Sequence, residues 1–189
     1  MPTVRLTAIA SLLALPVIAS DPSAAMTEYV RQSVMTWMSN PEIVNAVVAR
    51  NVATSGLSDE EVVALDNQWR AEIGAPSSPL IDMIMGSAAS DAIRSQVENT
   101  DGMITEVFVM DARGLNVAAS GVTSDFWQGD EAKFQETHGV GAGAIHVDEI
   151  SFDESTQTYQ GEVSFTLIDP ATGAPIGAVT VGLNVEAFF

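Results

Sequence analysis

Apolar side chains in the first half of the chain recur every three or four residues, the spacing of a helix that buries one face. At Asn40-Pro41 the pattern restarts, and proline at the first helical position predicts either one kinked helix or two consecutive helices. Ser58 and Glu61 have the spacing of a capping box and predict a further helix start. Residues 26–99 are therefore predicted to be mostly helical.

From Thr100 onward, apolar residues alternate with polar ones, as in strands that bury one face. Within 158–169, for example, Val163 and Phe165 fall on one face and Glu162 falls on the other. Five strands are predicted, at residues 104–111, 115–120, 144–153, 158–169 and 176–188. Helices followed by antiparallel strands predict an α+β domain whose N-terminal helices pack on one face of a five-stranded sheet.

One long insertion, residues 120–145, separates the second predicted strand from the third. It exceeds the usual length of a hairpin loop, and long loops often carry function. It contains TSDFWQGDEAKFQETHG, in which Phe126, Trp127 and Phe134 accompany Lys133, the only lysine of the chain. A short helix is predicted around Lys133, on the sheet face that the N-terminal helices leave uncovered.

The composition is strongly acidic and limits the functions that fit this domain. Asp and Glu number 25 against 7 Lys and Arg, which gives a net charge of −18 at pH 7. Such a charge repels nucleic acids and anionic lipids, and it favours cations or basic protein surfaces as partners. A hydrophobic fraction of 47% indicates a folded chain with a substantial core. Without cysteine, disulfides, thiolate metal sites and a cysteine nucleophile are excluded.

The first 25 residues have the layout of a secretory signal peptide. A positive charge near the N-terminus precedes an apolar run, and small residues lead up to Ala25. The run falls short of the roughly 20 apolar residues that span a bilayer. The sequence thus predicts a signal peptide at 1–25 and one domain at 26–189, divided into a helical part, 26–99, and a sheet part, 100–189. This domain is expected to be periplasmic or secreted, with no membrane span after cleavage.

Three motifs, in order along the chain, resemble the extracytoplasmic PAS-like sensor domains of the single Cache or PDC family. VFVMDARGLNVAAS is similar to the family's strand–turn–strand motif, with Asp111, Gly114 and Ser120 at its recurring positions. TSDFWQGDEAKFQ is similar to its aromatic-rich lid, and SFDESTQTYQGEVSFTLIDPATGAPIGAVTVGLNVE is similar to its closing strands. The resemblance covers residues 41–188. It implies a PAS-like sheet with a long helix on one face and a small-molecule pocket on the other, beneath a lid.

We call residues 120–145 the lid, and most candidate ligand-binding residues lie in it. Aromatic side chains would form a pocket wall, and polar side chains would orient a ligand. These candidates are Phe126, Trp127, Gln128, Asp130, Lys133, Phe134 and Asp153. For Lys133 two interpretations stay open, an ion pair with Asp130 or Asp153, and a contact with a ligand carboxylate.

The resemblance also indicates a role for Asp153. In the amino-acid-binding branch of the family, an acidic residue after an aromatic one in the third strand holds the ligand ammonium, and Phe152-Asp153 matches this pair. Asp153 equally suits a solvated turn. The arginine that this branch carries in its lid has no counterpart here, and lysine offers a point charge where arginine offers a two-pronged clamp. The expected ligand is therefore a small polar, charged organic molecule of unidentified structure.

The predicted function is a non-enzymatic sensing module that needs no cofactor and signals through a separate partner, such as a membrane receptor or kinase. No histidine is paired with a nucleophile in a recognisable motif, so covalent catalysis has no candidate.

Three alternatives remain. One is a PAS-like dimerisation or docking protein that binds no ligand, for which a homodimer is expected. Another is a divalent-cation sensor built on acidic residues, among them Asp148, Glu149, Asp153 and Glu154, although these lack calcium-loop spacing. The third is a lyase or hydrolase that uses the carboxylates.

Overall fold

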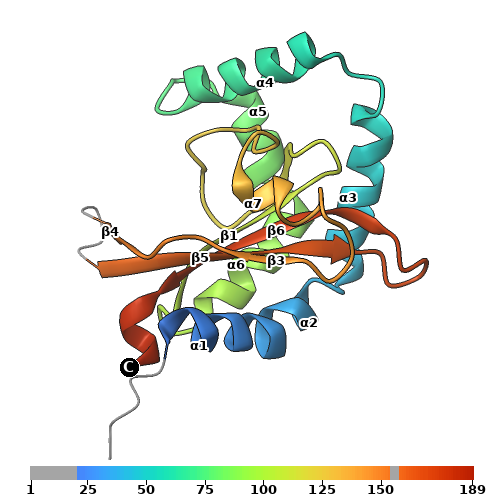
Figure 1. Cartoon of the computed structure of the whole chain (residues 1–189). Helices are drawn as coiled ribbons and strands as arrows, with labels where there is room; N and C mark the ends of the chain where they lie inside the picture. Colours follow the sequence, from blue (N-terminus) through green and yellow to red (C-terminus); the bar gives the residue numbers. More distant parts are fainter. Residues whose placement is uncertain (1–20, 154–157) are drawn as a thin grey trace, which may run out of the picture.

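The computed structural model describes residues 21–153 and 158–189, which form an antiparallel sheet with helices on both faces (Figure 1). The predicted α+β class is confirmed. The helices are α1 (Pro22–Tyr29), the π-helical η1 (Val30–Val34), α2 (Met35–Trp37), α3 (Pro41–Thr54), α4 (Asp59–Glu72), α5 (Pro79–Met85), α6 (Ala88–Glu98), α7 (Ala132–Gln135) and the 3₁₀ helix η2 (Val185–Phe188). The strands are β1 (Ile104–Met110), β2 (Asn116–Ala119), β3 (Ile145–Val147), β4 (Ser151–Asp153), β5 (Thr158–Ile168) and β6 (Pro175–Asn184).

The helix starts follow from local sequence. The Asn40 side chain accepts the N–H of Glu42, so α2 and α3 are two consecutive helices, one of the two arrangements expected at Asn40-Pro41. Ser58 and Glu61 form the predicted reciprocal capping box of α4. Within the described residues, no helix combines the length and the apolar character needed to cross a membrane. Residues 1–20 of the predicted signal peptide lie outside the described residues, so the signal peptide remains a prediction.

The strand order is β2-β1-β6-β5-β3, and β4 also pairs with β5, so the described sheet has six strands where five were predicted. The predicted third strand is divided, because four steps from Val147 to Ser151 face three steps from Val163 to Gln160. One extra residue interrupts the ladder there, as in a bulge. The predicted last strand ends early, at Asn184, whose side chain accepts the N–H of Glu186 and caps η2.

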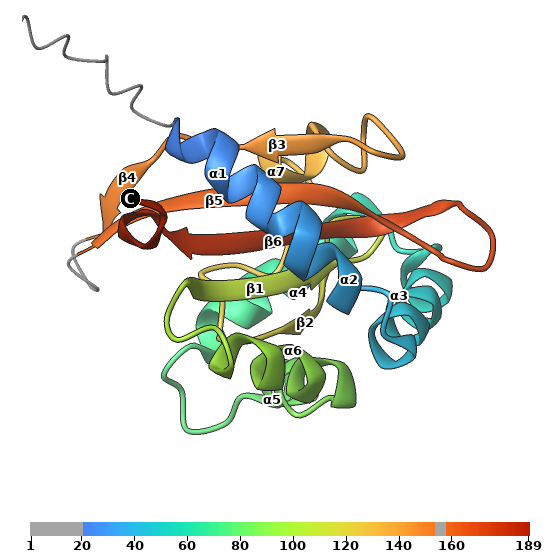
Figure 2. The same ribbon diagram turned by 90° about the horizontal axis from the view of Figure 1, so that it is seen from below.

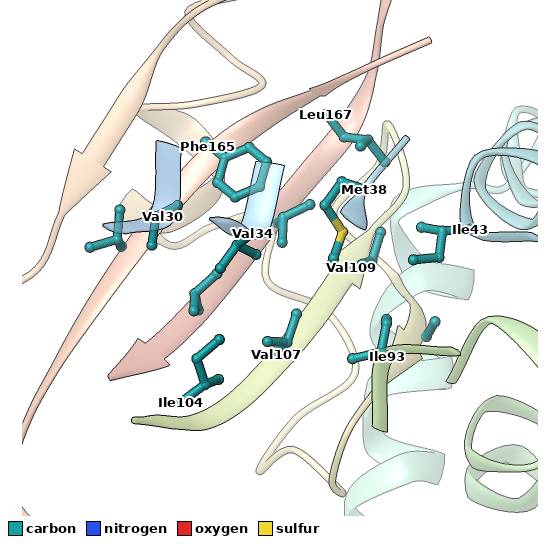
Figure 3. Close-up of a cluster of buried hydrophobic side chains, with 14 of the residues drawn as sticks. Val30, Val34, Met38, Ile43, Ile93, Ile104, Val107, Val109, Phe165 and Leu167 are labelled. Carbon is teal, nitrogen blue, oxygen red and sulfur yellow. The ribbon is translucent and has the colours of Figure 1, made fainter. Parts of the chain in front are cut away.

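The back of the sheet carries the main hydrophobic core, shown in Figure 3. α1, η1 and α2 lie across the strands on this face (Figure 2). The side chains of Val30, Val34 and Met38 point toward the strands. Phe165 and Val109 contribute from the strands. The predicted alternation is confirmed, because Val163 and Phe165 belong to this core.

The helical part does not cover a single face, which corrects the prediction. α4 and α5 lie on the opposite side of the sheet, which we call the front, together with α7 (Figure 1). The N-terminal helices and α6 already cover the back of the sheet. α4 and α5 therefore bury their apolar side chains in a second cluster, which includes Trp69 and Phe126. The Glu72 carboxylate accepts the N–H groups of Leu80 and Ile81, which fixes the start of α5 against α4.

The length of the lid has a geometric reason. β2 and β3 lie at opposite ends of the strand order, so the connection between them must cross the sheet. Four inter-strand spacings of about 4.8 Å amount to roughly 19 Å, which a tight turn cannot span. The lid makes this crossing over the front face, as predicted, and α7 lies above β5 and β6 (Figure 1).

Phe165→Ala is expected to lower the free energy of unfolding by about 3–5 kcal/mol, because it leaves a cavity in the back core. Val52→Ala is the matched control, since Val52 is 76% exposed on α3, and it should change stability by less than about 0.5 kcal/mol. Urea unfolding measures both. A Phe165→Ala protein as stable as the wild type would contradict this assignment of the core.

Candidate functional site

The first half of the lid is built into the second hydrophobic cluster. The Phe126 ring is fully buried and stacks on Trp69, with ring centroids 5.2 Å apart. Asp66 of α4 accepts the N–H groups of Phe126 at 2.8 Å and Trp127 at 3.1 Å, and the indole of Trp69 donates to the Thr123 carbonyl at 2.8 Å. Phe126 is therefore a core residue that anchors the lid to α4.

Trp127 connects the lid to the turn between β1 and β2. Its indole N–H donates to the Arg113 carbonyl at 2.9 Å. Gly114 has φ +80°, and a Cβ there would lie 2.6 Å from the Cα of Gly129, so only glycine allows this close approach. Buried Asp111 accepts the N–H groups of Arg113 and Leu115, which fixes the turn. The family-like motif around Asp111 and Gly114 thus serves to position the lid.

The second half of the lid packs on the front of the sheet. Phe134 of α7 contacts a small cluster formed by Phe108, Met110, Ala119 and Ala178. Thr137, at the end of this segment, is fully buried. α7 is therefore seated on the strands by an apolar contact, next to a group of charged side chains.

Lys133 lies at the centre of these charges. Its ammonium is 2.9 Å from Oε2 of Glu162 on β5 and 3.3 Å from Oε2 of Glu131, and it lies 5.4 Å from the centroid of the Phe108 ring. Only 14% of the side chain is exposed. Burial lowers the Lys133 pKa, but the two carboxylates outweigh this effect and leave the pKa raised. Lys133 is therefore a charged group that already has two partners.

Two hollows meet at Lys133. The larger, of about 650 Å³, is lined by Glu106, Glu131, Lys133, Asp148, Glu149, Ser151, Phe152, Gln160, Gly161 and Glu162. The smaller, of about 500 Å³, is lined by Glu106, Phe108, Val122, Thr123, Ser124, Asp125, Gln128, Glu131, Lys133 and Glu162. They share Glu106, Glu131, Lys133 and Glu162, and we call the two together the groove.

The groove is strongly acidic. Five carboxylates and a single ammonium line its larger hollow, and Asp125 adds a carboxylate to the smaller one. Burial raises the pKa of Glu131, although the Lys133 ammonium opposes this effect. Among the residues with described positions, no group of three His, Asp or Glu side chains is placed to hold a metal ion.

The structure brings some of the predicted site residues together and separates others. Lys133 and Gln128 line the groove. Phe126, Trp127 and Phe134 line neither hollow, because their rings pack against α4, the β1–β2 turn and the sheet. Asp130 is exposed and lines neither hollow.

The remaining predicted contact involves the third strand. Asp153 pairs through its backbone with Thr158 at the end of β4, and its side chain lies outside the described part of the chain. Among the described residues, the partners of Lys133 are Glu131 and Glu162, neither of which was predicted. Alternation along 158–169 had placed Glu162 on the face opposite Val163, but it did not identify Lys133 as its partner.

Comparisons with known proteins give likeness at the level of structure. No family model and no curated protein matches the sequence. Among solved structures, the chain is similar to the sensor domain of the V. cholerae histidine kinase DctB, with 12% identity and a TM-score of 0.41 over 87% of this chain and 59% of that one. It is also similar to the ligand-binding domain of the Campylobacter jejuni chemoreceptor Tlp3 in complex with 4-methylisoleucine, with 11% identity and a TM-score of 0.41 over 85% and 64%.

A third similar structure is the ligand-binding domain of the Pseudomonas aeruginosa amino acid chemoreceptor PctC in complex with GABA. It has 12% identity and a TM-score of 0.43 over 89% of this chain and 63% of that one. The chain thus spans 59–64% of the length of these three structures. Each of these three structures is a sensor or ligand-binding domain.

His138, which follows α7, makes the stability of the fold depend on pH. Burial lowers its pKa, against an opposing effect of Asp111, and its buried Nδ1 has no hydrogen-bond partner among the described residues. As pH falls through about 6.5, the ordinary pKa of histidine, the unfolded chain binds a proton before the folded one does. The contribution of His138 to stability is therefore complete above that pH and is lost progressively below it.

We expect His138→Gln to reduce the loss of unfolding free energy between pH 7.5 and pH 5.5. Urea unfolding of the wild type and the variant at both values measures the difference, and carboxylates that titrate in both proteins cancel in the comparison. Equal losses in the two proteins would contradict a neutral, half-buried His138.

Proposed function

We propose that this protein is an extracytoplasmic sensing module that binds a small, charged organic molecule in the groove and signals through a separate partner. The observation that carries the proposal is the groove itself, a pair of hollows of about 650 and 500 Å³ between the lid and the front of the sheet. Volumes of this order suit small ligands.

The lining of the groove supports a charged ligand. It combines carboxylates and one ammonium with the Phe108 and Phe152 rings and the Gln128 and Gln160 amides. Oriented polar groups beside aromatic rings are the usual means of recognising a small polar molecule. The Lys133 ion pairs show that this environment holds charges of opposite sign together.

The arrangement of the lid supports a role in sensing. One half is anchored to α4 through Asp66 and Trp69, whereas the other half, with α7, rests on the strands that line the groove. A ligand between α7 and β5 would change how this half of the lid sits, and a membrane receptor or kinase that contacts the lid would read that change. The extracytoplasmic location follows from the N-terminal pattern at 1–25.

A thermal-shift screen over amino acids, carboxylates, amines and divalent cations is expected to give at least one organic compound that raises the melting temperature, since a ligand that binds the folded state stabilises it. Ser151→Trp should abolish that shift, because Ser151 lines the larger hollow and an indole there would obstruct it without changing its charge. Ser95→Trp, at an exposed position of α6, is the matched control and should keep the shift.

Three outcomes would contradict the proposal. A shift that persists unchanged in Ser151→Trp would place the ligand outside the larger hollow. A screen with no organic hit, together with a tight dimer by ultracentrifugation, would favour the docking function. Chemical conversion of a hit during incubation, followed by mass spectrometry, would instead show an enzyme.

A further inference from the structure

The contacts of Lys133 have the composition of a binding site for an ammonium group. We call the Glu131 and Glu162 carboxylates and the Phe108 ring the ammonium site. Its carboxylates lie 3.3 and 2.9 Å from the Lys133 ammonium, and the ring centroid lies 5.4 Å away. Carboxylates and an aromatic face are the groups that stabilise a partly desolvated cation. The cation that occupies this site in the free protein belongs to the chain itself.

The position of the ammonium site makes it accessible to a ligand. Glu131, Lys133 and Glu162 line both hollows, so a molecule in either one lies next to the site. The Lys133 side chain comes from the four-residue helix α7, and its ion pair with Glu162 connects α7 to β5. Withdrawal of Lys133 would therefore open the site and break this connection in a single step.

The charges of the groove select the sign of the ligand. A ligand carboxylate would have to displace two carboxylates that already contact Lys133, and it would face Glu106, Asp148 and Glu149 in the larger hollow. A ligand ammonium is instead attracted by every one of these carboxylates.

Building on the proposed function, we propose that the ligand is an organic diamine that takes over the ammonium site from Lys133. Lys133 is then a tethered competitor that fills the site in the free protein. One ligand ammonium contacts Glu131, Glu162 and the Phe108 ring, and the second reaches the carboxylates of Asp148 and Glu149 in the larger hollow.

This second contact gives the diamine its advantage over the lysine. Lys133 carries a single ammonium and is held close to the site by the chain, so a monoamine competes with it poorly. A diamine adds an interaction that Lys133 cannot make. Its binding releases α7 from Glu162, which converts occupancy of the groove into a change in the lid.

The test compares wild-type protein with Lys133→Met, which keeps an unbranched side chain one atom shorter and removes the ammonium. We expect the Kd of 1,4-diaminobutane, measured by calorimetry, to be about tenfold lower in Lys133→Met, because a site that is free only a tenth of the time weakens apparent affinity by that factor. Propylammonium should raise the melting temperature of Lys133→Met and leave that of the wild type nearly unchanged.

Three controls separate the site from general charge effects. Arg94→Met removes a surface cation that pairs with Asp91 on α6, and it should not enhance diamine binding. Lys133→Met combined with Glu162→Gln should lose the enhancement. Magnesium chloride at equal concentration should not reproduce the effect of the diamine. If Lys133→Met does not fold without amine, recovery of its folding on adding propylammonium is the equivalent measurement. The Lys133→Gln variant then replaces Lys133→Met in the titrations.

Hydrogen exchange reports the lid. 1,4-Diaminobutane should increase amide exchange at residues 132–137 of the wild type, as α7 loses its ion pair with β5. Unchanged or slower exchange there on saturation with the diamine would overturn the release of the lid.

The inference and the proposed function fail in different ways. A carboxylate hit that Ser151→Trp abolishes and Lys133→Met weakens would leave the sensing function intact and overturn the diamine. Equal diamine affinities in wild type and Lys133→Met would also overturn it. If no organic compound binds the wild type, and amines do not bind Lys133→Met, both proposals are wrong.

Discussion

The ion pairs of Lys133 join the lid to the sheet, and the geometry of the groove depends on them. Lys133 is the one lysine of a chain with a net charge of −18, and it lies between Glu131 of the lid and Glu162 of β5. In water such a pair would contribute little. Here only 14% of the Lys133 side chain is exposed, so water screens the carboxylates less, and loss of the ammonium would leave both carboxylates without their cation.

The lid divides its apolar and charged residues between two tasks. Phe126 and Trp127 belong to the half that is fixed by Asp66, Trp69 and the β1–β2 turn, where fully paired backbone groups and stacked rings hold the chain. The half with α7 rests on the sheet through Phe134 and through charges. Segments held by few buried contacts open at lower free energy than core segments do. The structure thus combines a firm anchor with a more easily displaced end.

Much of the fold could be predicted because its signals are local. The capping box of Ser58 and Glu61, proline after Asn40, and the alternation around Val163 each depend on residues close in sequence. The length of the lid was also informative, since a crossing of the sheet requires it. The errors concern long-range placement, such as α4 and α5 on the front of the sheet and the extra residue that divides the predicted third strand.

The sequence by itself determined the class of the domain, the position of the lid and the importance of Lys133, because periodicity, loop length and charge are properties of the chain. Only the tertiary structure decided which lid residues face the groove. Phe126 is two residues from Gln128, yet Phe126 stacks on Trp69, whereas Gln128 lines the smaller hollow. That difference arises from α4, some 60 positions earlier, whose Asp66 binds the lid backbone. Contacts between such distant segments leave no local pattern, so neither the core role of Phe126 nor the pairing of Lys133 with Glu162 could be read from spacing.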